Sequence, residues 1–123
     1  MKTLLVLGAV NGALAVMLGA FGAHGLKARV DAAMLQTWAT ASEYHIFHAL
    51  ALLLTGLMAK QFAGAGGIVV SGWLLFAGMT IFSGSLYLLV LSGQRWLGAI
   101  TPIGGTLLII GWLWLAWSLY RQA

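Results

Sequence analysis

The most informative features of this sequence are the residues that it lacks or uses sparingly. Cysteine is absent from all 123 positions, which excludes disulfide bonds, thiolate nucleophiles and thiolate metal ligands together. Charged residues make up only 7% of the chain, whereas a soluble domain is about one quarter charged. Two acidic and six basic residues cannot keep the surface of a globular domain hydrated. The chain is therefore predicted to face lipid instead of water.

Proline is also scarce, with one residue, whereas glycine occurs 17 times and hydrophobic residues fill 62% of the positions. At this density in a lipid-facing chain, glycine indicates helices whose backbones approach one another closely. No basic stretch is interleaved with aromatic residues outside the apolar segments, which excludes a nucleic acid as the partner. The predicted surrounding of the chain is the lipid bilayer.

The apolar residues fall into four stretches that are separated by short polar or glycine-rich turns. The first stretch is 21 residues long, which corresponds to a helix of about 31 Å and matches the hydrocarbon thickness of a bilayer. The second apolar run is shorter, and we expect its helix to begin earlier, with Asp31 as the N-cap. We predict an all-α integral membrane bundle of four transmembrane helices. It forms a single domain over 1–123, with approximate spans 3–23, 38–59, 67–91 and 101–120.

Small residues mark a packing face on three of the predicted helices. On the first helix they gather on one side, and bulky residues such as Leu14 and Met17 occupy the opposite side. Since lipid is as apolar as leucine, the small side should pack on protein and the bulky side should meet lipid. The predicted packing residues are Gly8, Asn11, Gly12, Gly19, Gly78, Gly104 and Gly111.

Four spans place both termini on one side of the membrane. Most of the polar and ionisable side chains then lie toward the other side. His24 ends the first span, whereas His45 and His48 lie near the start of the second. Because a short loop joins these ends, His24 should approach the other two histidines more closely than any histidine approaches Asn11. The complete predicted cluster is His24, Glu43, Tyr44, His45, His48, Ser83, Ser85 and Tyr87.

This cluster has two interpretations. In the functional one, His24, His45 and His48 bind a metal, a haem or an anionic headgroup, or relay protons. In the structural one, neutral imidazoles form hydrogen bonds between helices. We favour the structural interpretation, because there is no evident fourth ligand and no His-Glu-x-x-His motif. The sequence does not identify which metal these histidines would bind, and no cofactor is predicted.

Glu43 differs from the histidines, because it lies about 140° around the helix from His48. It could pair with Lys27, Arg29 or Arg95 instead of joining the cluster. The two carboxylates of the chain do not form a pair suited to acid–base catalysis, and no nucleophile with an adjacent base is evident. No catalytic residue is predicted, and the chain is expected not to be an enzyme.

Four motifs of the sequence resemble one known family. They are GAFGAHGL at 19–26, YHIFHAL at 44–50, FSGSLY at 82–87 and TPIGG at 101–105. In this order they resemble the YgdD-type family of small bacterial inner-membrane proteins, a domain of unknown function with eukaryotic relatives. The resemblance covers nearly the whole chain. It implies four spans and a place in the bacterial inner membrane, and it implies no particular activity.

The sequence favours a non-enzymatic structural or accessory membrane protein. The alternative is a ligand-binding module, or a small-solute or proton transport module, that uses the histidine cluster. A homo-oligomer and a complex with another membrane protein are both compatible with the glycine-rich faces. Lysine and arginine are divided three to three between the two sides, and Lys2 beside the amino terminus favours cytoplasmic termini.

Overall fold

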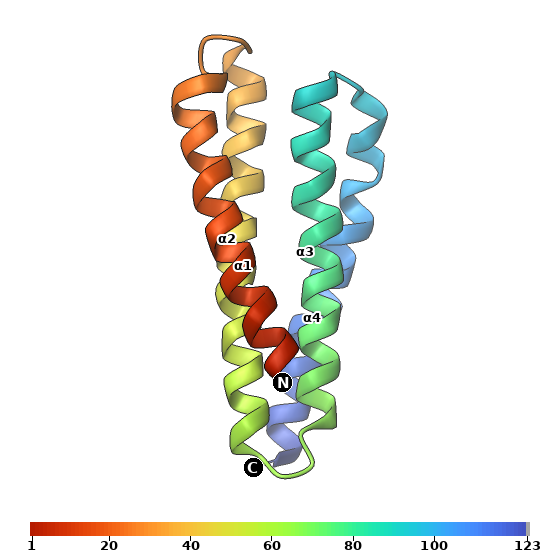
Figure 1. Ribbon diagram of the computed structural model, residues 1–123. Coiled ribbons are helices and arrows are strands. Elements are labelled where there is room, and N and C mark those ends of the chain that lie inside the picture. Colours follow the sequence, from red (N-terminus) through yellow and green to blue (C-terminus); the bar gives the residue numbers. More distant parts are fainter. Residues whose placement is uncertain (123) are drawn as a thin grey trace.

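The computed structural model describes residues 1–122 and consists of four long helices joined by short connections (Figure 1). A short π-helix, Gly22–Leu26, continues the first long helix, and a 3₁₀-helix, Arg95–Ala99, precedes the last. No strand occurs in the described part of the chain, so the all-α prediction is confirmed. The long helices are α1 (Lys2–Phe21), α2 (Ala32–Gln61), α3 (Gly66–Ser92) and α4 (Thr101–Gln122).

Local chemistry explains where α2 begins and where α3 ends. The carboxylate of Asp31 accepts a hydrogen bond of 2.8 Å from the backbone N–H of Met34, which confirms Asp31 as the N-cap of α2. At the end of α3, Gly93 adopts a left-handed conformation with φ of 72° and donates its N–H to the carbonyl of Leu89. Glycine adopts this conformation without steric cost.

Three segments are long and apolar enough to cross a membrane: Lys2–Leu26, Gly66–Ser92 and Arg95–Gln122. The remaining helix, α2, has 30 residues and is therefore long enough. Its polar side chains lower its apolar content, so composition alone does not mark it as a span. However, α2 packs lengthwise against both α1 and α3 (Figure 1). We therefore assign it to the same membrane depth as its neighbours, as the fourth span.

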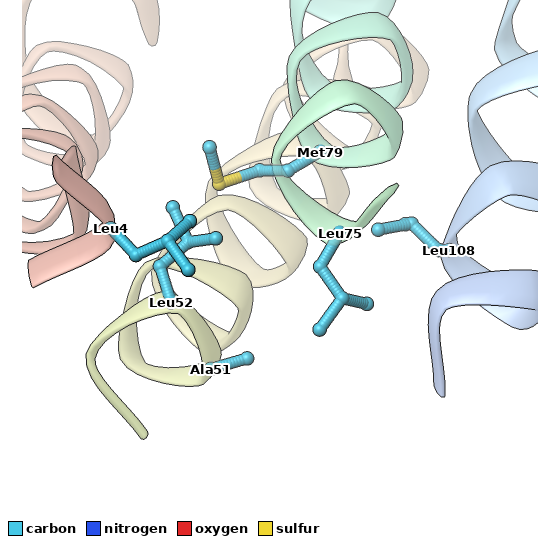
Figure 2. Packing of buried hydrophobic residues seen from close by; sticks show 6 residues of the cluster. All are labelled: Leu4, Ala51, Leu52, Leu75, Met79 and Leu108. Atoms are coloured by element: carbon cyan, nitrogen blue, oxygen red, sulfur yellow. The ribbon is translucent and has the colours of Figure 1, made fainter. Parts of the chain in front are cut away.

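The helices pack in chain order, α1 on α2, α2 on α3 and α3 on α4. Figure 1 shows α1 crossing toward α3 only near its N-terminus and diverging from it toward the α1–α2 connection. Leu4 makes this contact, since its side chain reaches Gly72 of α3. A central apolar cluster joins all four helices, and Figure 2 shows its residues: Leu4, Ala51, Leu52, Leu75, Met79 and Leu108.

Glycine permits the close approach of α3 and α4. A Cβ atom on Gly104 would lie 2.8 Å from Cα of Phe82, and one on Gly78 would lie 2.8 Å from the backbone nitrogen of Leu108. A Cβ atom on Gly111 would lie 2.9 Å from Cδ2 of Leu75. The three glycines predicted to pack on these helices therefore do so.

The first helix bears out the predicted packing face only in part. A Cβ atom on Gly8 would lie 2.9 Å from the carbonyl oxygen of Ala49, so Gly8 packs tightly on α2 as predicted. For Gly12 the prediction is wrong, because an added Cβ would meet nothing within 4 Å. It is also wrong for Gly19, whose added Cβ would meet only Ser42, at 4.0 Å. The reason is that only α2 covers α1 along its length, so the contact is narrower than the small-residue face.

The opposite side of α1 faces outward, as predicted. Leu14 is 40% exposed and Met17 is 59% exposed. In a membrane these side chains meet lipid or a partner protein.

Candidate functional site

The best-defined polar site begins at His48, midway along α2. Its Nε2 accepts a hydrogen bond of 3.0 Å from the indole N–H of Trp112 in α4. Nδ1 therefore carries the proton of the neutral ring, and it donates to the carbonyl oxygen of Tyr44 over 2.7 Å. Both ring nitrogens are thus engaged, one within α2 and one between helices.

His45, one turn earlier, connects three helices. Its Nε2 lies 2.9 Å from Oδ1 of Asn11 in α1, and its Nδ1 lies 3.0 Å from the hydroxyl of Tyr87 in α3. The amide nitrogen of Asn11 donates to the carbonyl of Leu7, so Oδ1 is the acceptor that faces the ring. In the neutral ring Nε2 then donates to Asn11, and Nδ1 accepts from Tyr87. His45 therefore holds α1 and α3 to α2.

Further polar contacts extend this network toward the α1–α2 connection. The hydroxyl of Tyr87 lies 3.4 Å from that of Ser42, and the hydroxyl of Ser83 donates to the carbonyl of Ala41 over 2.8 Å. The ring of Tyr87 packs against Trp38 with a centroid distance of 4.7 Å. Trp38 in turn donates its indole N–H to the carbonyl of Leu18 in α1.

Ser85 belongs to a separate contact between α3 and α4. Its hydroxyl lies 2.6 Å from that of Thr101, and it also donates to the carbonyl of Phe82. Among the described residues, every buried side-chain nitrogen and oxygen has a hydrogen-bond partner. Some of these partners are side chains of other helices, and others are backbone carbonyls, such as that of Leu52 for Thr55 and that of Ile68 for Ser71.

His24 does not join the other two histidines. It lies in the π-helix Gly22–Leu26, and its side chain is exposed. Within residues 1–122, no three histidine or acidic side chains come together in a way that could hold a metal ion. The predicted approach of His24 to His45 or His48 is also wrong, because the close contact of a histidine is the one between His45 and Asn11.

The physical reason for this difference is the length of α2. The cap at Asp31 starts the helix at Ala32, so 13 residues separate that start from His45. The histidines consequently lie at mid-depth, about 20 Å along the helix axis from its start. His24 stays at the end of α1.

Tyr44 lies at the exposed edge of the network, and Glu43 lies outside it. Tyr44 is 41% exposed, and its ring stacks on His48 at 6.0 Å and packs against Phe82 at 4.5 Å. The side chain of Glu43 is exposed on the outer surface of α1 and α2. The groove that it lines contains no lysine, arginine or histidine among the described residues, so the predicted pairing with Lys27, Arg29 or Arg95 is not found there.

Two tryptophans of the network were not predicted as site residues. Trp112 lies in the middle of α4, and Trp38 lies in the first part of α2. A tryptophan deep in a predicted span has an indole N–H that needs an acceptor, because lipid offers none. That requirement is the signal by which Trp112 could have been found.

The network also borders an open cleft between α1 and α3. The cleft has a volume of about 150 Å³, and Asn11, His45, Ser83 and Tyr87 are among the residues that line it. Polar side chains that are otherwise buried thus form part of the wall of this cleft.

Comparison with known proteins identifies the family. The family model described as "Protein of unknown function (DUF423)" matches residues 18–105. The chain belongs to the DUF423 family. Its resemblance to a family of small membrane proteins of unknown function is thereby confirmed at that level.

Several relatives of this DUF423 chain are described as membrane proteins. The UPF0382 membrane protein YwdK of Bacillus subtilis is 49% identical over 113 residues, which are 92% of each chain. A UPF0382 membrane protein of Staphylococcus aureus is 47% identical over 125 residues, covering 100% of this chain and 99% of the relative. One from Staphylococcus epidermidis is 50% identical over 115 residues, covering 92% of this chain and 91% of the relative. No solved structure matches the chain.

The part matched by the DUF423 model contains most of the polar network. Trp38, His45, His48 and Tyr87 lie inside the matched residues, as do Ser83, Ser85 and Thr101. Their partners Asn11 and Trp112 lie outside. The DUF423 chain is therefore an all-helical membrane protein in which His45 and His48 form hydrogen bonds between helices.

Proposed function

We propose that this DUF423 chain is a non-enzymatic structural or accessory protein of the bacterial cell membrane, of the YgdD type. It acts through contacts with lipid and with membrane partners, and both of its termini lie in the cytoplasm. The origin of its relatives in Bacillus and Staphylococcus and their description as membrane proteins support the location. The four ordered motifs support the family type.

One observation carries the non-enzymatic proposal. The two buried imidazoles are engaged in hydrogen bonds: His48 with Trp112, and His45 with Asn11 and Tyr87. A general base needs a free ring nitrogen within reach of a substrate proton. Here the imidazoles serve as interhelical connectors instead.

A double-mutant cycle on His48 and Trp112 tests this role. His48→Phe, Trp112→Phe and the double variant are compared with the unmodified protein by unfolding in mixed detergent micelles. We expect a coupling free energy of about 0.5–1.5 kcal/mol, because interhelical hydrogen bonds in membranes contribute on this scale. The metal content and the visible spectrum are measured on the same samples.

A different result of the same measurements would assign His48 a binding role. Zero coupling together with a stoichiometric metal or a haem absorption band, both lost in His48→Phe, would show that His48 is a ligand. The protein would then be a binding module.

The second candidate function is the binding or transport of a small solute. The cleft between α1 and α3 favours it, because Asn11, His45 and Tyr87 line its wall. This function predicts that His45→Phe abolishes solute binding while the fold persists. The structural role instead predicts lower stability in that variant.

A further inference from the structure

A groove on the outer surface of α1 and α2 contains an acidic side chain in an apolar setting. It consists of two adjoining hollows of about 280 and 290 Å³, which share Gly19, Ser42 and Glu43. The rest of the lining is predominantly apolar and includes Ala15, Val16 and Ile46. Glu43 is one of only two acidic residues in the sequence, and the other is the N-cap Asp31.

Glu43 lies near the middle of α2. Glu43 lies 11 residues after the first residue of α2 and 18 before its last. Its Cα is therefore about 5 Å from the midpoint of the helix, at 1.5 Å per residue. The hydrocarbon core of a bilayer extends about 15 Å to either side of its centre. With the midpoint of α2 placed at the centre of the bilayer, the Cα of Glu43 therefore lies within the depth of the hydrocarbon core.

A charge at this depth is costly unless an opposite charge accompanies it. The described lining of the groove contains no basic residue that could accompany Glu43. A ligand that matches such a groove is an apolar molecule that carries one positive charge. We propose that the groove binds a lipophilic organic cation, with Glu43 as its counter-charge and the small residues of α1 and α2 as its apolar wall.

Charge also distinguishes this occupant from a second copy of the chain. In a dimer with a two-fold axis at the groove, the same surface faces itself, so Glu43 would meet Glu43 of the other copy. Like charges at close range repel each other. The proposal does not depend on the structural role of the histidines, because the groove and the ring of His45 involve different side chains.

Binding of tetraphenylphosphonium to the full-length protein in lipid nanodiscs tests the proposal. The free cation is measured with a tetraphenylphosphonium-selective electrode, and empty nanodiscs provide the background. We expect saturable binding to the unmodified protein and at least a tenfold loss of affinity in Glu43→Gln. Gly19→Leu should also abolish binding, since its side chain would fill the groove without removing the charge.

Asp31→Asn is the matched control, because it removes the other negative charge and keeps a good N-cap residue. Its affinity should equal that of the unmodified protein. Tetraphenylborate, an anion of the same shape, should show no binding above the background. Circular dichroism of each variant confirms that the helices persist.

Three results would overturn the proposal. The first is the absence of saturable binding above that of empty nanodiscs. The second is equal affinity of the unmodified protein and Glu43→Gln. The third is normal binding by Gly19→Leu, which would place the cation outside the groove.

Discussion

At the scale of single residues, the requirement to satisfy polar groups in lipid explains the positions of the buried side chains. The hydrocarbon core offers no water, so a donor such as His45 Nε2–H needs an acceptor in the protein. Asn11 supplies that acceptor from the neighbouring helix. The stabilisation from each bond is modest, since the unfolded chain within the membrane also finds partners.

Asn11→Ala tests this contact. The substitution leaves His45 Nε2 without its acceptor, and we expect the free energy of unfolding in mixed micelles to fall by about 1 kcal/mol. Thr106→Ala is the control, because the hydroxyl of Thr106 is exposed and bonds only the carbonyl of Pro102 in its own helix. Equal stability of the two variants would show that the bond between Asn11 and His45 contributes nothing.

At the scale of the helices, close packing depends on which neighbour covers each face. Gly104 lies in the interface of α3 and α4, where an added Cβ would approach the backbone at Phe82. Gly12 lies on α1, where an added Cβ would meet no neighbouring atom. Two glycines that look equivalent in the sequence therefore differ in what surrounds them.

Alanine substitutions at these two glycines should have opposite effects. Gly104→Ala forces the backbones of α3 and α4 apart, and we expect a loss of about 1–3 kcal/mol in the free energy of unfolding. Gly12→Ala should be neutral, or should stabilise α1 by up to about 1 kcal/mol, since alanine favours the helix. Detergent unfolding of both variants measures the difference. A comparable loss in Gly12→Ala would indicate that this face is covered, for example in an oligomer.

At the scale of the whole molecule, the order of the helices decides which connections and termini share an end of the bundle. The N-terminus, the connection between α2 and α3 and the C-terminus lie toward one end (Figure 1). Lys2, Lys60 and Arg121 belong to the helix termini nearest that end, whereas His24 and Arg95 lie near the opposite one. The equal division of basic residues leaves Lys2, beside the amino terminus, as the feature that favours cytoplasmic termini.

Reporter fusions at the C-terminus test this orientation. Alkaline phosphatase is active only outside the cytoplasm, so a fusion after residue 123 should be inactive, and a green fluorescent protein fusion should fluoresce. A second phosphatase fusion in the connection between α1 and α2 should be active. An active C-terminal phosphatase fusion would reverse the proposed orientation.

The four-helix architecture could be predicted from the sequence because it depends on local properties. The scarcity of charge and the length of the apolar stretches indicated membrane helices, and the side chain of Asp31 marked the start of α2. The glycines predicted to pack on α3 and α4 lie in the contact between these two helices, although the sequence did not identify the partner helix. These features act within one helix or recur along it, so they can be read without knowing the neighbours.

The polar site could be predicted only in part. His45, Ser83 and Tyr87 line one cleft, whereas His24 lies in the π-helix after α1 and Trp112 was not among the predicted site residues. The partners of a side chain depend on the rotation of each helix about its axis and on which helices are adjacent. The sequence by itself determined that this chain forms apolar helices with a few polar groups that need partners. Only the tertiary structure decided which groups meet, because the pairing of Asn11 with His45 and of His48 with Trp112 arises from contacts between helices distant in the chain.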